Sequence, residues 1–187
     1  INWENDGFVI KNFKPSVIRN SNYYFKPCIT WSFNVSSNFG VRYSYPGFVF
    51  DVNGSSVFVE KKMINYFVGF MCSKLAFYFL SMLNPTFSFQ VGNVADLPLI
   101  FPDVDTTNSA VDLLVKRNIE IAKEDWDSFE VSWDFIRHPL VNQNKLLGTV
   151  EQSFNNWETN ARNRFNQLKN NEEELNRNFI NRVIFIF

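Results

Sequence analysis

The chain has 187 residues, of which 45% are hydrophobic, and its 22 Phe and 5 Trp exclude a disordered protein, since disordered chains lack such apolar surface. This length allows one domain with a full core, or a smaller domain with a helical appendage. The formal net charge of -1 counts against tight autonomous binding of nucleic acid, because phosphate contacts usually need a surplus of Lys and Arg.

Residues 8–59 consist of short aromatic and β-branched runs separated by turn residues, a pattern that predicts strands. We expect strands at 29–31, 41–43, 48–50 and 57–59. Tyr45-Pro46-Gly47 predicts a hairpin turn between the second and third of these, and Asn53-Gly54 predicts another turn. The fold class that we expect is α+β, with a strongly twisted, antiparallel or mixed sheet.

The apolar run at 63–83 is too long for one strand and predicts a single helix that packs on this sheet. Gly69, Ser73 and Ala76 recur at helical spacing, so the helix has a face of small residues that permits close approach. A membrane span is the alternative, but Ser73 and Lys74 lie near its middle, where a charge is costly. A buried core helix is therefore the preferred interpretation, with no membrane contact.

The composition becomes charged and polar after Phe101-Pro102-Asp103, which divides the chain into a domain at 1–102 and a helical segment at 103–187. Thr106, Thr107 and Asn108 offer N-caps for a helix at about 110–126. Pro139 would stop any helix at His138. One apolar stripe then predicts a long amphipathic helix of about 30 residues: Val150, Phe154, Trp157, Ala161, Phe165, Leu168, Leu175 and Phe179.

Several segments together resemble the C-terminal target-recognition region of the PglX family, the adenine-specific DNA methyltransferases of BREX phage-defence systems. They are INWENDG at the start, YYFKPCITWS from Tyr23, VRYSYPGFVFDVNGSSVF from Val41, GFMCSKLAFYFL from Gly69, NPTFSFQVG from Asn84 and DWDSFEVSWDFIRHPL from Asp125. Related modules occur in restriction-modification specificity subunits. In such modules a helix, a loop and a short strand ending in Leu-Pro, here Leu97-Pro98, pack against a curved sheet that faces DNA.

The resemblance implies that this chain reads DNA sequence for an adenine N6 methyltransferase that uses S-adenosylmethionine. The catalytic domain would lie outside the chain, which then holds no cofactor itself. Double-stranded DNA, that catalytic domain and other defence-system subunits are the expected partners. Two alternatives remain open: a module that docks other defence subunits, and the recognition domain of an enzyme that fuses restriction with methylation.

The long helix also allows more than one interpretation. It resembles the spacer arms that lie beside recognition domains in specificity subunits, but it would equally suit a helix packed on its own domain. Self-association through Trp157 and Phe165 is a third possibility.

Residues with catalytic or metal-binding chemistry are scarce, and we predict no catalytic residue and no metal site. His138 is the only histidine, and Cys28 and Cys72 lack metal-ligand spacing. Asn84-Pro85-Thr86-Phe87 imitates the motif with which amino-methyltransferases hold a flipped base, but it lacks the second Pro and no Gly-rich cofactor turn precedes it. We interpret it as a turn. Two unpaired cysteines and no secretory signal predict a cytoplasmic protein.

The basic residues are concentrated in the first hundred positions, against few carboxylates: Lys11, Lys14, Arg19, Lys26, Arg42, Lys61, Lys62 and Lys74. This asymmetry predicts a locally basic N-terminal part. Lys and Arg suit phosphates and guanine edges, whereas Gln, Ser and Thr suit adenine edges and the DNA backbone. The candidate DNA-binding residues are Lys26, Ser32, Arg42, Tyr43, Lys61, Lys62, Thr86, Ser88 and Gln90. We expect Trp31 to serve the core.

Overall fold

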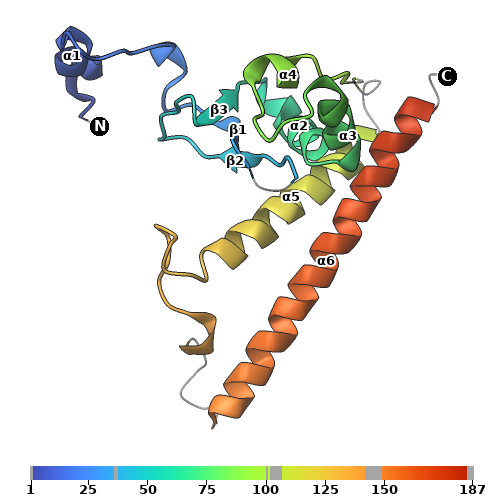
Figure 1. Cartoon of the computed structure of the whole chain (residues 1–187). Coiled ribbons are helices and arrows are strands. Elements are labelled where there is room, and N and C mark those ends of the chain that lie inside the picture. The colour runs from blue at the N-terminus through green and yellow to red at the C-terminus, as the bar shows by residue number, and fades with distance from the viewer. Residues whose placement is uncertain (1, 36–37, 100, 102–106, 142–148, 185–187) are drawn as a thin grey trace.

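The computed structural model describes residues 2–35, 38–99, 101, 107–141 and 149–184, and confirms the α+β class (Figure 1). Its elements, in chain order, are α1 (Glu4–Asn12), η1 (Ser21–Tyr23), β1 (Cys28–Ser32), β2 (Arg42–Ser44), β3 (Gly54–Val57), η2 (Lys61–Met63), α2 (Ile64–Met71), α3 (Lys74–Leu83), α4 (Val91–Ala95), α5 (Thr107–Trp126), η3 (Pro139–Val141) and α6 (Val150–Ile184).

The sheet has three antiparallel strands in the order β2-β1-β3, so β1 lies in the middle. Side chains alternate between the two faces of a strand. Ile29 and Trp31, which are 0% and 1% exposed, therefore point toward the core, while Thr30 and Ser32 point to the opposite face. Opposite Thr30 stand Arg42 of β2 and Ser56 of β3, which share its outward direction.

The chain beyond β1 continues the sheet with a segment that is distant in sequence. Asn34 forms a β-bridge with Ser88. The backbone N–H of Phe89 donates to the Phe33 carbonyl at 2.7 Å, and the N–H of Val35 donates to the Phe87 carbonyl at 3.1 Å. The loop after α3 is thereby fixed at the end of the sheet.

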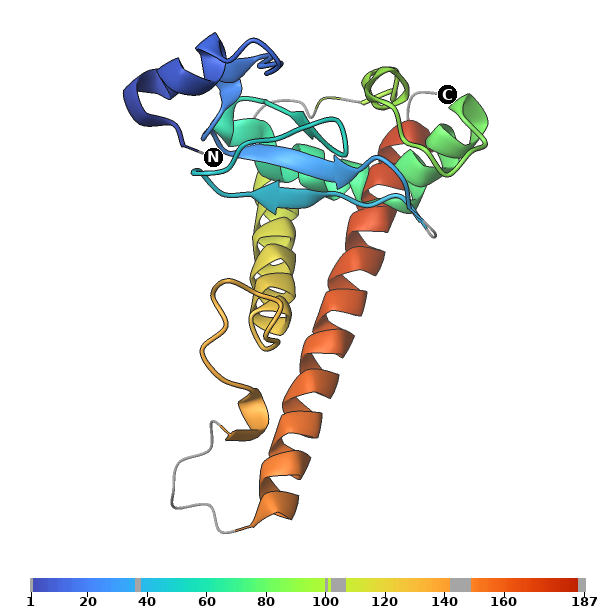
Figure 2. The same ribbon diagram turned by 60° about the vertical axis from the view of Figure 1, so that its left-hand side comes forward.

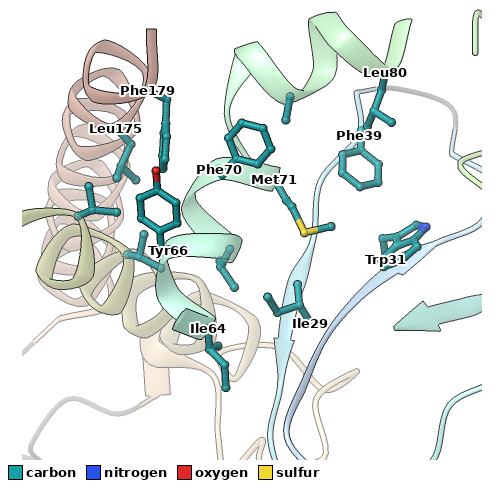
Figure 3. Packing of buried hydrophobic residues seen from close by; sticks show 14 of the residues in the cluster. Ile29, Trp31, Phe39, Ile64, Tyr66, Phe70, Met71, Leu80, Leu175 and Phe179 are labelled. Atoms are coloured by element: carbon teal, nitrogen blue, oxygen red, sulfur yellow. The ribbon is translucent and has the colours of Figure 1, made fainter. Parts of the chain in front are cut away.

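Helix α2 occupies the centre of the core, between the sheet on one side and α5 and α6 on the other (Figure 3). Six of its eight residues are buried: Ile64, Tyr66, Val68, Gly69, Phe70 and Met71. Val111 and Val115 of α5 and Leu175 and Phe179 of α6 belong to the same apolar cluster. A helix that is apolar on every side has to be enclosed in this way.

Helices α5 and α6 run away from the sheet, as Figure 2 shows, and α6 reaches much further than the core. Only its C-terminal part is buried, through Leu175 and Phe179. Residues 150–171 of α6, together with α5 and residues 127–141, are here called the arm. Along the arm the Asn171 amide donates to Asn118 Oδ1 at 2.8 Å, and Arg164 pairs with Glu124 at 2.9 Å. The prediction of one long amphipathic helix is confirmed.

One predicted helix is in fact two. The run 63–83 breaks at Cys72 and Ser73, where α3 turns by 72° from the preceding helical stretch. The Ser73 hydroxyl accepts a hydrogen bond from the N–H of Ala76 at 3.2 Å, and Asn176 Oδ1 of α6 accepts one from the N–H of Lys74 at 2.8 Å. Ser73 is thus an N-cap, which the apolar periodicity around it concealed.

Several finer predictions about strands and turns are wrong. Residues 48–50 form no strand and β3 ends at Val57, because Phe50 packs edge-on against Tyr24 at 5.4 Å and against Phe58 at 5.2 Å. The turn at Tyr45-Pro46-Gly47 exists, but Gly47 N–H donates to the carbonyl of Phe25 rather than closing a hairpin.

Two further expectations need correction. The segment before Leu97-Pro98 is the short helix α4, not a strand. The stripe on α6 is also interrupted, because Phe165 is 65% and Val150 87% exposed, whereas Trp157 and Leu168 are half-buried. The predicted boundary between residues 102 and 103 and the N-cap Thr106 lie outside the described residues, and the two-part division stays a prediction.

None of the described helices has by itself the length and apolar character needed to span a membrane. The stretch 61–71 and α3 meet that test only when they are taken together across their bend.

We predict that Gly69→Ala destabilises the fold. A Cβ at this position would lie 2.8 Å from Val115 Cγ2 and 3.4 Å from Phe179 Cε2. Overpacking of this kind costs about 1–3 kcal/mol of unfolding free energy. Urea unfolding followed by circular dichroism measures it. Gly92→Ala in α4, with no atom within 4 Å of the added Cβ, is the matched control and should be nearly neutral. Equal unfolding of both variants would contradict the close packing of α2 on α5.

Candidate nucleic-acid interface

The face of the sheet that points away from α2 is polar. By the strand register it carries Thr30 and Ser32 of β1, Arg42 and Ser44 of β2, and Ser56 of β3. Arg42 is exposed and the others are half-buried. The guanidinium of Arg42 can donate to phosphates and to base edges. The hydroxyls of Thr30 and Ser56 donate to the carbonyls of Ser55 and Gly54, so toward a ligand they can act as acceptors.

Two of the candidate residues meet on this face. Arg42 Nη2 donates to the Ser32 hydroxyl oxygen at 3.0 Å. A guanidinium has five N–H donors in a planar fork, and this contact uses one of them. Ser32 therefore orients the guanidinium and leaves its other donors directed at solvent.

The polar row continues into the loop after α3. Ser88 Oγ donates to Asn34 Oδ1 at 2.6 Å, and the Asn34–Ser88 bridge places both side chains on one face. Ser88 N–H in turn donates to Thr86 Oγ1 at 3.3 Å. β1 ends at Ser32 and the chain bends at Phe33, so Asn34 and Ser88 lie just beyond the end of the strand, where Asn34 is exposed. We call Ser32, Arg42, Asn34, Thr86 and Ser88 the polar row.

Asn84 holds this loop in shape. Its Oδ1 accepts hydrogen bonds from the N–H and the hydroxyl of Thr86 at 3.2 and 2.8 Å, and its Nδ2 donates to the Ser88 carbonyl at 2.8 Å and to Asn93 Oδ1 at 3.0 Å. Each group of the amide is thus engaged within the protein. This supports the interpretation of Asn84-Pro85-Thr86-Phe87 as a turn, since a base-holding Asn needs a free amide.

Tyr43 lies apart from the other candidates. It faces Ile29 across the ladder and packs against the apolar core, with its ring 4.8 Å from that of Tyr45. Burial raises the pKa of its hydroxyl above the usual value. Trp31 is likewise a core residue, as expected: its indole N–H donates to the Phe89 carbonyl at 2.9 Å.

Three lysines lie at the other end of the sheet. Lys26 precedes the start of β1, and its ammonium stands 5.4 Å from the Tyr23 ring centre. That ring also contacts Phe58, at 4.7 Å, which brings residues 58–62 to the same end. Lys61 and Lys62 are both exposed, and Lys62 pairs with Glu60 at 3.0 Å. Gln90 is exposed at the start of α4, beyond the polar row.

The local charge favours an anion. Residues 1–102 contain eight Lys and Arg and five Asp and Glu, a balance of +3 in a chain whose net charge is -1.

The residue that the sequence argument missed is Asn34. No local pattern identifies it, because β1 ends at Ser32 and Asn34 is positioned by its bridge to Ser88, which is 54 residues away in sequence.

Comparison with known proteins adds an independent finding. No family model matches the chain. It is 39% identical over 191 aligned positions to the adenine-specific methyltransferase PglX of Lacticaseibacillus casei (strain Zhang), and 34% identical over 187 to the adenine-specific methyltransferase BrxX of Escherichia coli O9:H4 (strain HS). Its homologues are adenine-specific methyltransferases. The alignments cover 96% and 98% of this chain but only 16% and 15% of PglX and BrxX.

We predict that Asn84→Ala lowers the free energy of unfolding, because the loop after α3 loses its hydrogen bonds to α4 and at the end of the sheet. Loss of the amide leaves its half-buried partners unsatisfied, at a cost of about 1–3 kcal/mol. Differential scanning fluorimetry should report a lower melting temperature, whereas Asn155→Ala, at an exposed position of α6, serves as the control. An unchanged melting temperature would mean that the network contributes nothing to the fold.

Proposed function

We propose that this chain is the DNA-recognition part of an adenine N6 DNA methyltransferase that uses S-adenosylmethionine and whose catalytic part lies outside the chain. The observation that carries the proposal is the polar row, which consists of two hydrogen-bonded groups: Arg42 with Ser32 on the outward face of the sheet, and Asn34 with Ser88 and Thr86 at its end. We assign adenine as the base that the parent enzyme methylates because PglX and BrxX are named adenine-specific methyltransferases.

The two ends of the sheet suit contact with a duplex. β1 has five residues, which correspond to about 13 Å between its ends at roughly 3.3 Å per residue. Duplex DNA rises about 3.4 Å per base pair, so the strand matches roughly four base pairs. Lys26, Lys61 and Lys62 at one end and Arg42 at the other would hold phosphates, and the groups between them would face the groove.

Asn34 is the residue best suited to read a base. An Asn amide pairs with adenine through one donor and one acceptor, and the Asn34 amide oxygen keeps a second lone pair besides the one that accepts from Ser88. Ser88 fixes the Asn34 side chain by donating to its Oδ1. In this arrangement the Asn34 amide N–H groups are directed outward from a firmly held side chain. Arg42, held by Ser32, has the geometry for the acceptor edge of guanine or for a phosphate.

A second function, docking of other subunits of a phage-defence complex, is favoured by a different surface. Phe165 is 65% and Phe154 46% exposed on the part of α6 that belongs to the arm. The arm and the polar row are separate surfaces, so both functions are compatible in one chain. A BREX-type defence system is the setting that the sequence resemblance suggests for either.

We predict that the chain binds duplex DNA with a strong salt dependence, and that Arg42→Ala weakens binding. Loss of one phosphate contact should lower the slope of log affinity against log salt concentration by about 0.9. Fluorescence anisotropy of a labelled duplex, titrated across a salt series, measures both quantities.

Arg162→Ala is the matched control, because Arg162 is an exposed arginine on the arm that pairs with Glu158. It should leave affinity and slope unchanged. Equal effects of the two substitutions would show that binding responds to net charge alone and would remove the sheet face as the interface. Absence of binding at low salt would also count against the proposal.

We further predict that the chain by itself transfers no methyl group. Incubation with duplex DNA and S-adenosylmethionine that carries a tritiated methyl group should leave the DNA unlabelled, because Asn84 has no free amide for an exocyclic amine. Methylated adenine above the level of a protein-free control would refute the recognition role as the sole role of this chain.

A further inference from the structure

The segment after α5 exposes a group of large apolar side chains. Trp133 is 95%, Ile136 89% and Val131 65% exposed, and Trp126 at the end of α5 is 57% exposed. Single exposed apolar residues are ordinary, but a group of this size that includes two Trp residues marks an interaction surface. We call Trp126, Val131, Trp133 and Ile136 the arm patch.

The arm patch is held firmly by its polar neighbours. Ser132, only 8% exposed, donates through its hydroxyl to Asp127 Oδ1 at 2.7 Å, and Asp134 pairs with Lys123 at 2.6 Å. The Asp134 N–H also donates to Ser132 Oγ at 3.1 Å. Ser132 is bonded to Asp127 and Asp134 to Lys123 of α5, so the backbone on both sides of Trp133 is held while the indole is exposed. An aromatic side chain presented from a held backbone suits a binding hot spot.

The charges around the arm patch disfavour nucleic acid as its partner. Residues 123–137 carry five carboxylates, at Glu124, Asp125, Asp127, Glu130 and Asp134, and two cations, Lys123 and Arg137. Arg164 of α6 adds a third cation through its pair with Glu124. The rim is therefore net acidic and would repel phosphates, while it complements a protein surface with an apolar hollow and a basic border.

The length of the homologues points to where that protein surface lies. This chain is aligned over 96–98% of its own length yet spans only 15–16% of PglX and BrxX. About five-sixths of such a polypeptide consequently lies outside it. A binding surface on the same polypeptide is always near the arm patch, so its effective concentration is high. Such a surface therefore binds the arm patch in preference to an equally complementary surface on a separate protein.

We propose that the arm patch docks on the remaining part of the same methyltransferase polypeptide and fixes the sheet face relative to it. Trp133 inserts into an apolar hollow there, and the acidic rim meets Lys or Arg side chains around that hollow. This inference rests on the homology and on the arm, and it is independent of whether the polar row reads DNA.

Photo-crosslinking in the full-length methyltransferase that carries this segment tests the proposal. Trp133→p-benzoylphenylalanine places the reactive group at the patch centre, and Asn160→p-benzoylphenylalanine, at an exposed position of α6, is the matched control. After irradiation, mass spectrometry identifies the joined peptides. We expect a crosslink yield about tenfold above the control, to peptides of the same chain outside this segment, with no dependence on protein concentration.

Three outcomes would overturn the proposal: a yield at position 133 equal to the control, crosslinks solely to a second copy that rise with concentration, and crosslinks solely to added DNA. Limited proteolysis of the full-length protein gives a second readout that needs no reactive group. Trp133→Ser with Ile136→Ser should raise the cleavage rate in residues 127–141 about tenfold. An unchanged cleavage rate would equally reject docking at this patch.

Discussion

An eight-residue helix as apolar as α2 cannot present any side to water, and the architecture follows from its enclosure. The sheet covers one side through Ile29 and Trp31, α5 another through Val115, and α6 a third through Phe179. Gly69 makes this possible, because any larger residue would meet Val115 Cγ2. The sheet is thereby fixed with one face against α2, and its other face is free for polar groups.

The enclosure of α2 also explains why the two ends of α6 have different contacts. Its C-terminal part, with Leu175 and Phe179, completes the core and supplies Asn176 to the start of α3. Residues 150–171 extend beyond the core beside α5 and contact it through Arg164 and Asn171. The polar row and the arm patch therefore lie on separate surfaces of the molecule.

The sequence was a good guide where a pattern is long and local. The 35-residue helix α6, the helix α5 and the central strand β1 all follow from periodicity. Arg42, Ser32, Thr86 and Ser88 were chosen for their chemistry, and the structure brings them into one row. Tyr43 was chosen in the same way but faces the core, because one step along a strand reverses the side-chain direction.

The sequence by itself determined the α+β class, the buried role of Trp31 and the concentration of cations before residue 102, since these depend on composition and local periodicity. Only the tertiary structure decided that the run 63–83 bends at Ser73, because Asn176, 102 residues later, helps to cap α3. It also decided that Asn34 joins Ser88. Pairing between distant segments has no local pattern, so the polar row exists only once the chain has folded.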